Sequence, residues 1–326
     1  MTSAQHASSS AISTSGLAKS YGFGPSRTNA LLPTTLAVQP GSIFALLGNN
    51  GAGKTTLIKL LVNILRPTAG QASVLNRLST SIVADDFTSI GYVSENQELP
   101  GWMTVAGFLR YQSGFYPRWN DADLIRRFDL PLNRKLKHLS RGQRMKVALT
   151  SVLAFAPQLI ILDEPFSGLD PQVRDELIEA LLDAAALRNS TASPLTILLS
   201  SHDLYEIESF STHVAFLRQG QLLFVEDMPS LYARFREVTV TLASAPPPSP
   251  PPSPSPSSNY PPSWLRIQHS GHTLRFIHSH ADSEPIEQQV REAFPDATAI
   301  DLQPINLRSI FLAIAYQDSA TEGGRS

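Results

Sequence analysis

Buried strands and an amphipathic helix alternate along the first part of the chain. The segment from Ser42 to Leu47 is apolar and leads into a glycine-rich turn, and apolar residues then recur at helical spacing from Lys54 to Leu65. Leu159 to Leu162 and Leu195 to Leu199 are short, continuous apolar runs of the kind found in interior strands of a parallel sheet. Because a helix is predicted between them, from Pro171 to Leu187, the pattern indicates an α/β domain.

A hairpin is predicted at the end of this domain. Val214 to Leu217 and Leu222 to Val225 are strand-like and flank Gln219-Gly220, a plausible turn. We therefore expect the first domain to finish shortly after this hairpin.

A smaller α+β domain is predicted next. Prolines alternate with serines from Ala245 to Pro262, where no apolar periodicity supports a buried face, so this segment is interpreted as a semi-rigid, polyproline-like spacer or loop. After it, Leu265 to Gln268 and Thr273 to Ile277 alternate like strands, and Pro285 to Phe294 has a helical pattern.

Both ends of the chain are expected to be unstructured. The Ser/Thr/Ala-rich start lacks the basic residues and apolar run of a signal peptide. The predicted organisation is a disordered tail, a large domain, a small domain containing the spacer, and a second tail, at residues 1–15, 16–235, 236–317 (spacer 245–262) and 318–326.

Composition narrows the class of protein. At 326 residues, 42% of them apolar, the chain is long enough for two cores. The formal net charge of -2 argues against a dedicated nucleic-acid surface. The absence of cysteine excludes disulfides, thiolate metal sites and cysteine nucleophiles. Since the sequence has no run of about 18 apolar residues, any membrane role is expected to come through a partner.

A phosphate-binding loop is predicted from Gly48 to Thr55. The run GNNGAGKT fits G-x-x-x-x-G-K-[ST], and its predicted strand before and helix after distinguish it from an ordinary glycine-rich turn. In such a loop, backbone N–H groups converge on phosphate oxygens, Lys54 reaches the β- and γ-phosphates, and Thr55 holds Mg²⁺. We expect ATP and Mg²⁺ as ligands. The predicted contacts here are Gly48, Asn49, Asn50, Gly51, Ala52, Gly53, Lys54, Thr55 and Thr56.

Two carboxylates follow the apolar run that ends at Leu162. Neighbouring residues on a strand point to opposite faces, so Asp163 and Glu164 are expected to differ in role. Asp163 is predicted to bind Mg²⁺, commonly through its water, and Glu164 to act as general base on the attacking water. The alternative is that both only terminate a strand at the surface.

A third motif, Leu139-Ser140-Arg141-Gly142-Gln143, opens a helix. Ser140 and Gln143 satisfy a capping box, which is a sufficient structural explanation for the pair. The order along the chain, with the phosphate loop before the motif and the carboxylates after it, resembles that of the ATP-binding cassette (ABC) ATPases, whose Leu-Ser-Gly-Gly-Gln signature occupies this place. The resemblance covers roughly residues 15 to 235.

The resemblance implies a fold and an assembly. The fold would be a P-loop NTPase domain with a RecA-like α/β core, an antiparallel β subdomain and an α-helical subdomain, followed here by a small α+β domain. Two such domains would pair head to tail, so Ser140 and Gly142, with Gln143, would contact ATP held by the opposite loop. Arg141 stands where the family usually has Gly, and its guanidinium either adds charge near the nucleotide or points to solvent.

The resemblance also implies roles for isolated residues. His202, after the strand ending at Leu199, would contact the γ-phosphate and the attacking water as the family's switch histidine, although a lone His there is usually structural. Asp170 belongs to the loop after the catalytic carboxylate and is also a good N-cap before Pro171. Tyr21 would stack on adenine, unless it is merely packed.

A link between Mg²⁺ and a transporter partner is expected after Gly91-Tyr92. The family has a glutamine there; spacing makes Glu95 the candidate, with Gln97 as the alternative for a longer loop. The aromatic residues that follow form either a docking surface for a membrane subunit or the core of the helical subdomain. They are Trp102, Phe108, Tyr111, Phe115, Tyr116 and Trp119.

The leading hypothesis is the ATPase subunit of a membrane transporter. It would work as a homo- or heterodimer with a separate permease on the cytoplasmic side of the inner membrane, and the segments 91–119 and 306–311 look most like export-type cassettes. A cassette acting on ribosomes or DNA commonly has two cassettes or a long coiled coil, and a P-loop kinase leaves Ser140 and His202 unexplained. We expect no nucleic-acid partner.

Overall fold

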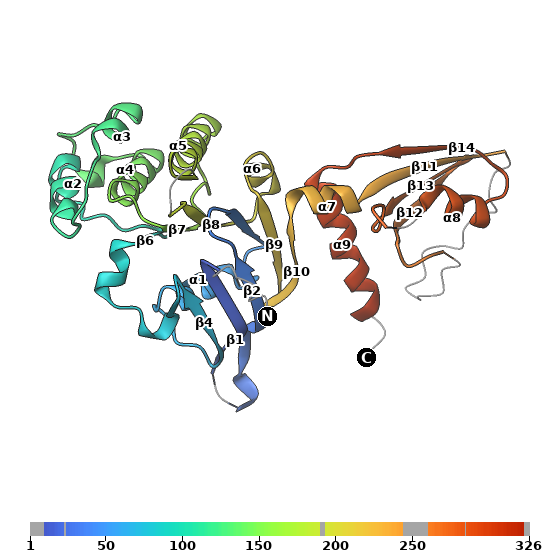
Figure 1. Ribbon diagram of the computed structural model, residues 1–326, viewed down its shortest axis with the longest axis horizontal. Helices are drawn as coiled ribbons and strands as arrows, with labels where there is room; N and C mark the ends of the chain where they lie inside the picture. Colours follow the sequence, from blue (N-terminus) through green and yellow to red (C-terminus); the bar gives the residue numbers. More distant parts are fainter. Residues whose placement is uncertain (1–9, 23, 190–192, 244–259, 284, 323–326) are drawn as a thin grey trace, which may run out of the picture. The chain divides into compact units, whose positions relative to one another are not determined.

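The computed structural model describes residues 10–22, 24–189, 193–243, 260–283 and 285–322. The chain divides into two compact units, Met1–Val225 and Glu226–Ser326, each considered by itself (Figure 1). The predicted limit between the two domains, at residue 235, remains a prediction.

A six-stranded sheet forms the centre of the first unit. β3 pairs in parallel with β8 and β9, and β7 pairs in parallel with β6 and β8. Every residue of β3, β7 and β8 is buried, which explains why their sequences are apolar throughout and confirms the strands predicted at 42–47, 159–162 and 195–199. In sheet order the strands are β10 (Gln221–Asp227), β9 (His213–Arg218), β3 (Ile43–Leu47), β8 (Thr196–Ser201), β7 (Leu159–Asp163) and β6 (Ile90–Val93).

The hairpin predicted near the end of this unit is present. Gln219 and Gly220 have φ angles of 50° and 81° and join β9 to β10. Two successive positive φ angles match the right-handed twist of paired strands, and glycine adopts them without strain.

An antiparallel sheet lies beside the six-stranded one. The predicted tail 1–15 is wrong for its last residues, because a strand begins at Ile12. Ile12 is buried and pairs with Val38 on one side and Val74 on the other, and the Thr14 hydroxyl donates to the Thr34 carbonyl. A Ser/Thr-rich segment can therefore be a central strand. The order is β2 (Thr28–Val38), β1 (Ile12–Tyr21), β4 (Ala69–Val74) and β5 (Arg77–Leu78).

Helix α1 (Lys54–Leu61) packs between the two sheets and contacts β2, β4 and β7. It ends before Leu65, the end that the apolar pattern predicts. Asn63 takes a left-handed conformation with φ of 59°, which stops the helix, while Leu65 still packs against the core from the following loop.

Helices α4 and α5 lie on the other side of the six-stranded sheet (Figure 1). Helix α4 packs against α5 and β6, and α2 packs against α4. The helix predicted at 171–187 is confirmed as α5. The α-helices are α2 (Val105–Ser113), α3 (Ala122–Arg127), α4 (Arg141–Leu153), α5 (Pro171–Asn189) and α6 (Leu204–Glu208). Short 3-10 helices are η1 (Gly24–Ser26), η2 (Ser79–Ser81), η3 (Ala84–Thr88) and η4 (Leu136–His138).

The aromatic residues near α2 differ in burial. Phe108 is buried, and the ring of Tyr116 stacks on that of Phe155 with centroids 4.0 Å apart, so part of the set belongs to the helical core. Trp102, Tyr111 and Phe115 remain exposed, at 72%, 53% and 58%. The core interpretation therefore holds for Phe108 and Tyr116, whereas docking by the exposed residues remains a prediction.

The second unit contains an antiparallel sheet in the order β12-β13-β11-β14. Its core lies on one face and includes Val238, Val240 and a Trp264–Phe276 ring stack with centroids 4.0 Å apart. The strands and helix predicted after the spacer are confirmed, whereas β14 escapes the pattern because most of its residues are exposed. The elements are α7 (Met228–Arg234), β11 (Arg236–Leu242), β12 (Trp264–Ser270), β13 (Thr273–His278), α8 (Ile286–Ala293), β14 (Ala297–Gln303) and α9 (Leu307–Glu322).

The C-terminal tail is shorter than predicted. Helix α9 runs to Glu322, past the expected limit at Asp318, because no glycine or proline interrupts it before Gly323 and because Leu307, Ile310 and Ala313 anchor its first turns in the core. Most of the predicted spacer, residues 245–259, lies outside the described residues. Within the described ranges, no helix has the length and apolar character required to cross a membrane.

Candidate functional site

The loop from Gly48 to Gly53 joins β3 to α1 and has room only for glycine at two positions. A Cβ on Gly48 would lie 2.3 Å from the Leu217 carbonyl oxygen, and one on Gly53 would lie 2.6 Å from the Ala30 carbonyl oxygen. Gly53 has a φ of 105° and directly precedes α1. The predicted strand, glycine-rich turn and helix are therefore found, and the turn is held against neighbouring backbone.

A pocket of about 260 Å³ opens over this loop. The N-terminus of α1 lines this pocket together with two carboxylates from other segments of the chain, those of Glu95 and Glu164. Gly48 and Asn49 instead turn their carbonyl oxygens to the Lys54 ammonium, at 2.5 and 3.3 Å. The pocket is lined by Ala30, Asn50, Gly51, Ala52, Gly53, Lys54, Thr55, Thr56, Glu95 and Glu164.

Three charged or titratable side chains form a chain of contacts at this pocket. Lys54 Nζ lies 2.9 Å from Glu164 Oε1, and His202 Nδ1 lies 2.7 Å from Glu164 Oε2. The side chains of Lys54 and Glu164 are only 5% and 8% exposed, whereas that of His202 is 42% exposed. Each oxygen of the Glu164 carboxylate thus faces one basic group, and burial strengthens the attraction between Lys54 and Glu164.

The backbone changes direction at Glu164. Strand β7 ends at Asp163, and Glu164 has a positive φ of 51°, so the alternation of side chains along a strand stops before it. Asp163 and Glu164 consequently lie beside consecutive residues of the phosphate loop, Thr55 and Lys54, rather than on opposite faces of a sheet.

Asp163 has a different set of partners. Its Oδ1 accepts hydrogen bonds from Thr55 Oγ1 at 3.1 Å and from Ser200 Oγ at 2.7 Å, and Ser200 Oγ also accepts the Glu164 N–H at 2.9 Å. Burial, and secondly the charge of Asp163, raise the pKa of Tyr92 to about 12, which keeps that phenol neutral.

Ser200 is the site residue that sequence reasoning missed. It lies opposite Asp163 in the pairing of β7 with β8. The sequence places both residues at the ends of apolar runs, and these runs form neighbouring parallel strands. Neither run, however, specifies the register in which the two strands pair.

The residues around Thr55 suit a small hard cation. The Thr55 hydroxyl and the Asp163 carboxylate are oxygen donors 3.1 Å apart, and Glu95 lines the same pocket. Mg²⁺ prefers oxygen ligands and usually retains water, so it does not require a dense cluster of protein ligands. The described residues contain no group of three or more His, Cys, Asp or Glu placed to hold a metal.

The structure separates Glu95 from Gln97. Glu95 lines the pocket, whereas Gln97 Oε1 accepts hydrogen bonds from the backbone N–H and the hydroxyl of Ser94, at 3.1 and 3.2 Å. Of the two candidates, only Glu95 is therefore in place beside the phosphate loop.

The residues Ser140 to Gln143 lie elsewhere. Ser140 Oγ accepts the Gln143 N–H at 3.2 Å and Gln143 Oε1 accepts the Ser140 N–H at 3.1 Å, so the predicted capping box is present at the start of α4. None of these four residues lines the pocket over the phosphate loop of the same chain.

Arg141 is exposed, and its guanidinium lies near the loop after Glu164 rather than at the phosphate loop of its own chain. Three atoms of its guanidinium group lie 3.5 to 3.6 Å from the position that a Cβ would take on Gly168, in the loop after Glu164. Gly142 is close-packed, since an added Cβ would come within 3.0 Å of Val173 on α5.

Asp170 and Tyr21 complete the predicted set. Asp170 Oδ1 accepts the Val173 N–H at 3.0 Å and so caps α5. Tyr21, at the end of β1, is 44% exposed, and the Lys19 ammonium lies 5.2 Å from its ring centroid. Tyr21 is not among the residues that line the pocket.

Comparison with known proteins identifies a family. The sequence model of the ABC transporter family matches residues 31–167. An uncharacterised ABC transporter ATP-binding protein of Bacillus subtilis strain 168, YhaQ, is 32% identical over 217 residues, 64% of this chain and 70% of YhaQ.

Two other relatives have names that state a role. The methionine import ATP-binding protein MetN 2 of Bacillus cereus strain ZK is 29% identical, over 65% of each chain. The daunorubicin/doxorubicin resistance ATP-binding protein DrrA of Streptomyces peucetius is 33% identical, over 65% of this chain and 64% of DrrA. For the relatives that match first, the matched part spans 56–65% of their own length.

The fold has a counterpart among solved structures. The dimeric post-hydrolysis structure of the ATP-binding cassette MJ0796 bound to ADP and phosphate has a TM-score of 0.59, with 21% identity, 67% coverage of this chain and 98% of that one. At this identity the likeness concerns the fold, and it confirms the predicted cassette architecture. By its sequence and fold, the chain belongs to the family of ABC transporter ATP-binding proteins.

Proposed function

We propose that the chain hydrolyses ATP and thereby powers a membrane transporter whose permease is a separate polypeptide. The observation that carries the proposal is the contact chain Lys54–Glu164–His202 beside the phosphate loop, with Asp163 hydrogen-bonded to Thr55 next to it. Binding, proton-accepting and positioning groups thus surround one pocket. We assign the cassette to the part of the chain up to residue 235 and an accessory domain to the part after it.

The residues of the loop bind the triphosphate. Backbone N–H groups of Asn50 to Thr56 and the Lys54 ammonium contact phosphate oxygens, aided by the N-terminus of α1. Thr55, Asp163 and Glu95 would hold Mg²⁺, which supplies neutralisation of phosphate charge when bound. Tyr21 is proposed to contact adenine from its exposed place on β1.

Glu164 and His202 act on the water. Glu164 accepts a proton from the water whose oxygen attacks the γ-phosphorus, while the bond from the γ-phosphorus to the bridging oxygen breaks and leaves ADP and inorganic phosphate. His202 Nδ1 lies 2.7 Å from Glu164 Oε2, and the His202 side chain is partly exposed. His202 can therefore orient the Glu164 carboxylate and contact the γ-phosphate at the same time.

The site of one chain is proposed to be completed by another. Ser140 is exposed at the start of α4, away from its own phosphate loop, where a head-to-tail partner would present its ATP. Gly142 and Gln143 follow it in the first turn, although Gly142 is buried. Asp170 and Arg141 border the same region through the loop after Glu164. The partner is a second copy or a related ATP-binding subunit.

The membrane partner is proposed to be an integral permease, which would hold the chain at the cytoplasmic side of the inner membrane. The exposed Trp102, Tyr111 and Phe115 offer an aromatic docking surface for it. Export is supported by the export-like segments 91–119 and 306–311 and by the drug-resistance role in the name of DrrA, while the name of MetN 2 refers to import.

The test is co-purification of the full chain with multi-spanning membrane proteins, followed by ATPase assays with and without them. We expect a permease to co-purify and to stimulate turnover, and we expect Trp102→Ala with Phe115→Ala to abolish co-purification while the basal ATPase activity persists. Co-purification with ribosomes or DNA in place of a membrane protein would overturn the transport proposal and leave the ATPase proposal standing. Absence of ATP turnover in the wild-type dimer would overturn the ATPase proposal.

A further inference from the structure

The Ser200 hydroxyl connects two acidic residues that follow each other along the chain. It donates a hydrogen bond to Asp163 Oδ1 at 2.7 Å and accepts one from the Glu164 backbone N–H at 2.9 Å. A serine hydroxyl has a single hydrogen to donate, and here that hydrogen is directed to Asp163. One side chain of β8 therefore holds the carboxylate of the first acidic residue and the main chain of the second.

The connection lies at the point where β7 leaves the sheet. The pairing of β7 with β8 ends with Asp163 opposite Ser200, and Glu164, with its φ of 51°, does not continue the strand. A buried backbone N–H at such a point needs a new partner, because an unpaired N–H away from water costs free energy. The Ser200 hydroxyl supplies this partner in place of a main-chain carbonyl.

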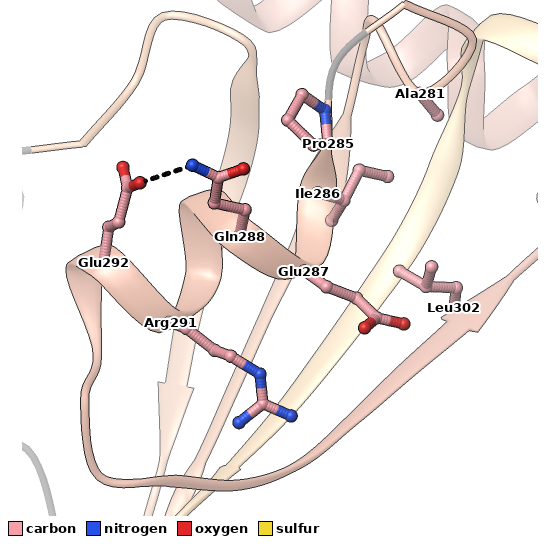
Figure 2. Close-up of a pocket in the computed structure, with 8 residues that line it drawn as sticks. All are labelled: Ala281, Pro285, Ile286, Glu287, Gln288, Arg291, Glu292 and Leu302. Carbon is pink, nitrogen blue, oxygen red and sulfur yellow. Dashed lines mark hydrogen bonds between the residues drawn. The ribbon is translucent and has the colours of Figure 1, made fainter.

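Burial makes this connection hard to replace with water. Ser200 is 0% exposed, and Asp163 and Glu164 are 2% and 6% exposed. In the second unit, by contrast, Gln288 donates to Glu292 at 2.9 Å along α8, beside a hollow of about 710 Å³ (Figure 2), and both residues are exposed. Water can replace an exposed hydrogen bond of that kind, whereas loss of the Ser200 hydroxyl would leave a buried N–H without a partner.

His202 holds the same acidic residue from the same end of β8. It follows Ser200 by two positions, and its Nδ1 lies 2.7 Å from Glu164 Oε2. Ser200 thus fixes the main chain of Glu164, and His202 contacts its side chain. The position of Glu164 relative to β8 is therefore set at two points.

Asp163 accepts both of its side-chain hydrogen bonds on one oxygen. Within the described part of the chain, the hydroxyls of Thr55 and Ser200 both donate to Oδ1, which leaves Oδ2 for another ligand. Thr55 lines the pocket and is proposed to hold Mg²⁺, whereas Ser200 does not line the pocket. The hydrogen bond from Ser200 can therefore keep Asp163 in place when the Thr55 hydroxyl is a cation ligand.

We propose that Ser200 is a positioning residue for ATP hydrolysis, which keeps the Asp163 carboxylate and the Glu164 main chain in a fixed arrangement. The proposal rests on the proposed function, in which these two residues are a Mg²⁺ ligand and the general base. Ser200 acts through its two partners and not through contact with the nucleotide. Partners that orient a metal ligand in this way typically contribute about 10- to 100-fold to metal affinity or activity.

Ser200→Ala tests the proposal, with Thr14→Val as the matched control. The Thr14 hydroxyl also bridges two strands from a buried position: it donates to the Thr34 carbonyl and accepts the Leu36 N–H, both at 3.0 Å. Val keeps the shape of Thr without the hydroxyl. Both variants should lower the urea midpoint of unfolding to a similar extent, because each leaves one buried N–H without a partner.

Only Ser200→Ala should change the reaction. We expect its kcat to fall about 10- to 100-fold while the Kd for ATP stays within about twofold of the wild-type value, because no group that lines the pocket is removed. Both quantities should be unchanged in Thr14→Val. Equal kcat values in the two variants would overturn the positioning role.

A measurement without turnover tests the link to the cation. In the full chain carrying Glu164→Gln, at saturating ATP, the unfolding temperature is followed as Mn²⁺ is added in place of Mg²⁺. Addition of Ser200→Ala should raise the half-saturating Mn²⁺ concentration about tenfold, whereas addition of Thr14→Val should leave it unchanged. An identical Mn²⁺ dependence in the two double variants would overturn the action of Ser200 on Asp163.

Failure of this proposal is distinguishable from failure of the proposed function. If Ser200→Ala keeps the kcat of Thr14→Val while Glu164→Gln loses turnover, Ser200 has no positioning role and the ATPase proposal stands. If the wild-type chain has no turnover, the ATPase proposal fails, and the Mn²⁺ titration still reports on Ser200. Should Ser200→Ala not fold, Ser200→Cys, whose thiol is a weaker donor and acceptor, replaces it and should show the same losses to a smaller extent.

Discussion

The phosphate loop and the Ser140 to Gln143 motif both lie at the start of a helix, yet their surroundings differ. At the loop, Lys54 and Glu164 are almost completely buried and in contact with each other and with His202. At the motif, Ser140 and Gln143 hydrogen-bond each other at an exposed helix start. Glu95 lines both the phosphate-loop pocket and the hollow beside Arg141, whereas Lys54 and Glu164 line the former.

The difference indicates how the work is divided within one chain. The loop carries charges that burial holds in fixed positions, as required for groups that transfer a proton or bind phosphate. The motif presents backbone and hydroxyl groups that are already arranged by a cap and remain accessible to another molecule. Variants at the two places should consequently fail in different ways.

The largest effect is expected for Glu164→Gln. The amide keeps the shape of the side chain but cannot accept the proton, so turnover should fall about 10²- to 10⁴-fold, the usual contribution of a general base. ATP binding should persist and an ATP-bound dimer should accumulate, measured by turnover and by size in the presence of ATP. Wild-type turnover in this variant would contradict the general-base role.

Lys54→Ala should reduce binding instead. The variant removes charge-assisted hydrogen bonds to phosphate worth about 1.5–3 kcal/mol, equivalent to an increase in the Kd for ATP of about 10- to 150-fold. Calorimetric titration with ATP measures this Kd. Lys59→Ala, on the same helix but outside the pocket, is the matched control and should leave the Kd unchanged.

Ser140→Ala tests the role of the Ser140 to Gln143 motif, as the previous two variants test the phosphate-loop pocket. Loss of the cap should lower the free energy of unfolding by about 1 kcal/mol, and Thr104→Ala, which removes the cap of α2, should cost a similar amount. Only Ser140→Ala should also reduce ATP turnover. Equal losses of turnover in the two variants would mean that Ser140 is a helix cap and no more.

The smallest effect is expected for Arg141→Gly. A charge near a helix start is worth about 0.3–1 kcal/mol, so turnover at low salt should change about two- to fivefold, and the change should shrink as salt rises. Arg141→Lys keeps the charge but removes the guanidinium that lies near Gly168, and so separates the contribution of charge from that of packing. Turnover that is unaffected by Arg141→Gly at every salt concentration would eliminate the electrostatic contribution.

The sequence predicts those strands that are buried on both faces of their sheet. Strands β3, β7 and β8 are buried on both faces, so their apolar runs could be identified without knowing their neighbours. Strands β1 and β14 were missed because their positions in their sheets, rather than their composition, make them strands.

The candidate site divides in the same way. The phosphate loop and Glu164 follow from local motifs, and the structure places them together. Ser200 and the direction of Arg141 depend on strand register and on packing against a distant loop, which local patterns do not specify. The end of α1 was misplaced because a single left-handed residue, Asn63, stops a helix whose apolar spacing continues.

The left-handed backbone at Glu164 has an evolutionary consequence. A residue with a side chain loses of order 1–3 kcal/mol in that conformation, and Gly or Asn would relieve much of the strain. Either replacement would also delete the carboxylate that faces Lys54 and His202. At this position, fold stability therefore favours Gly or Asn, whereas the reaction requires Glu. Selection for thermal stability alone would be expected to replace Glu164.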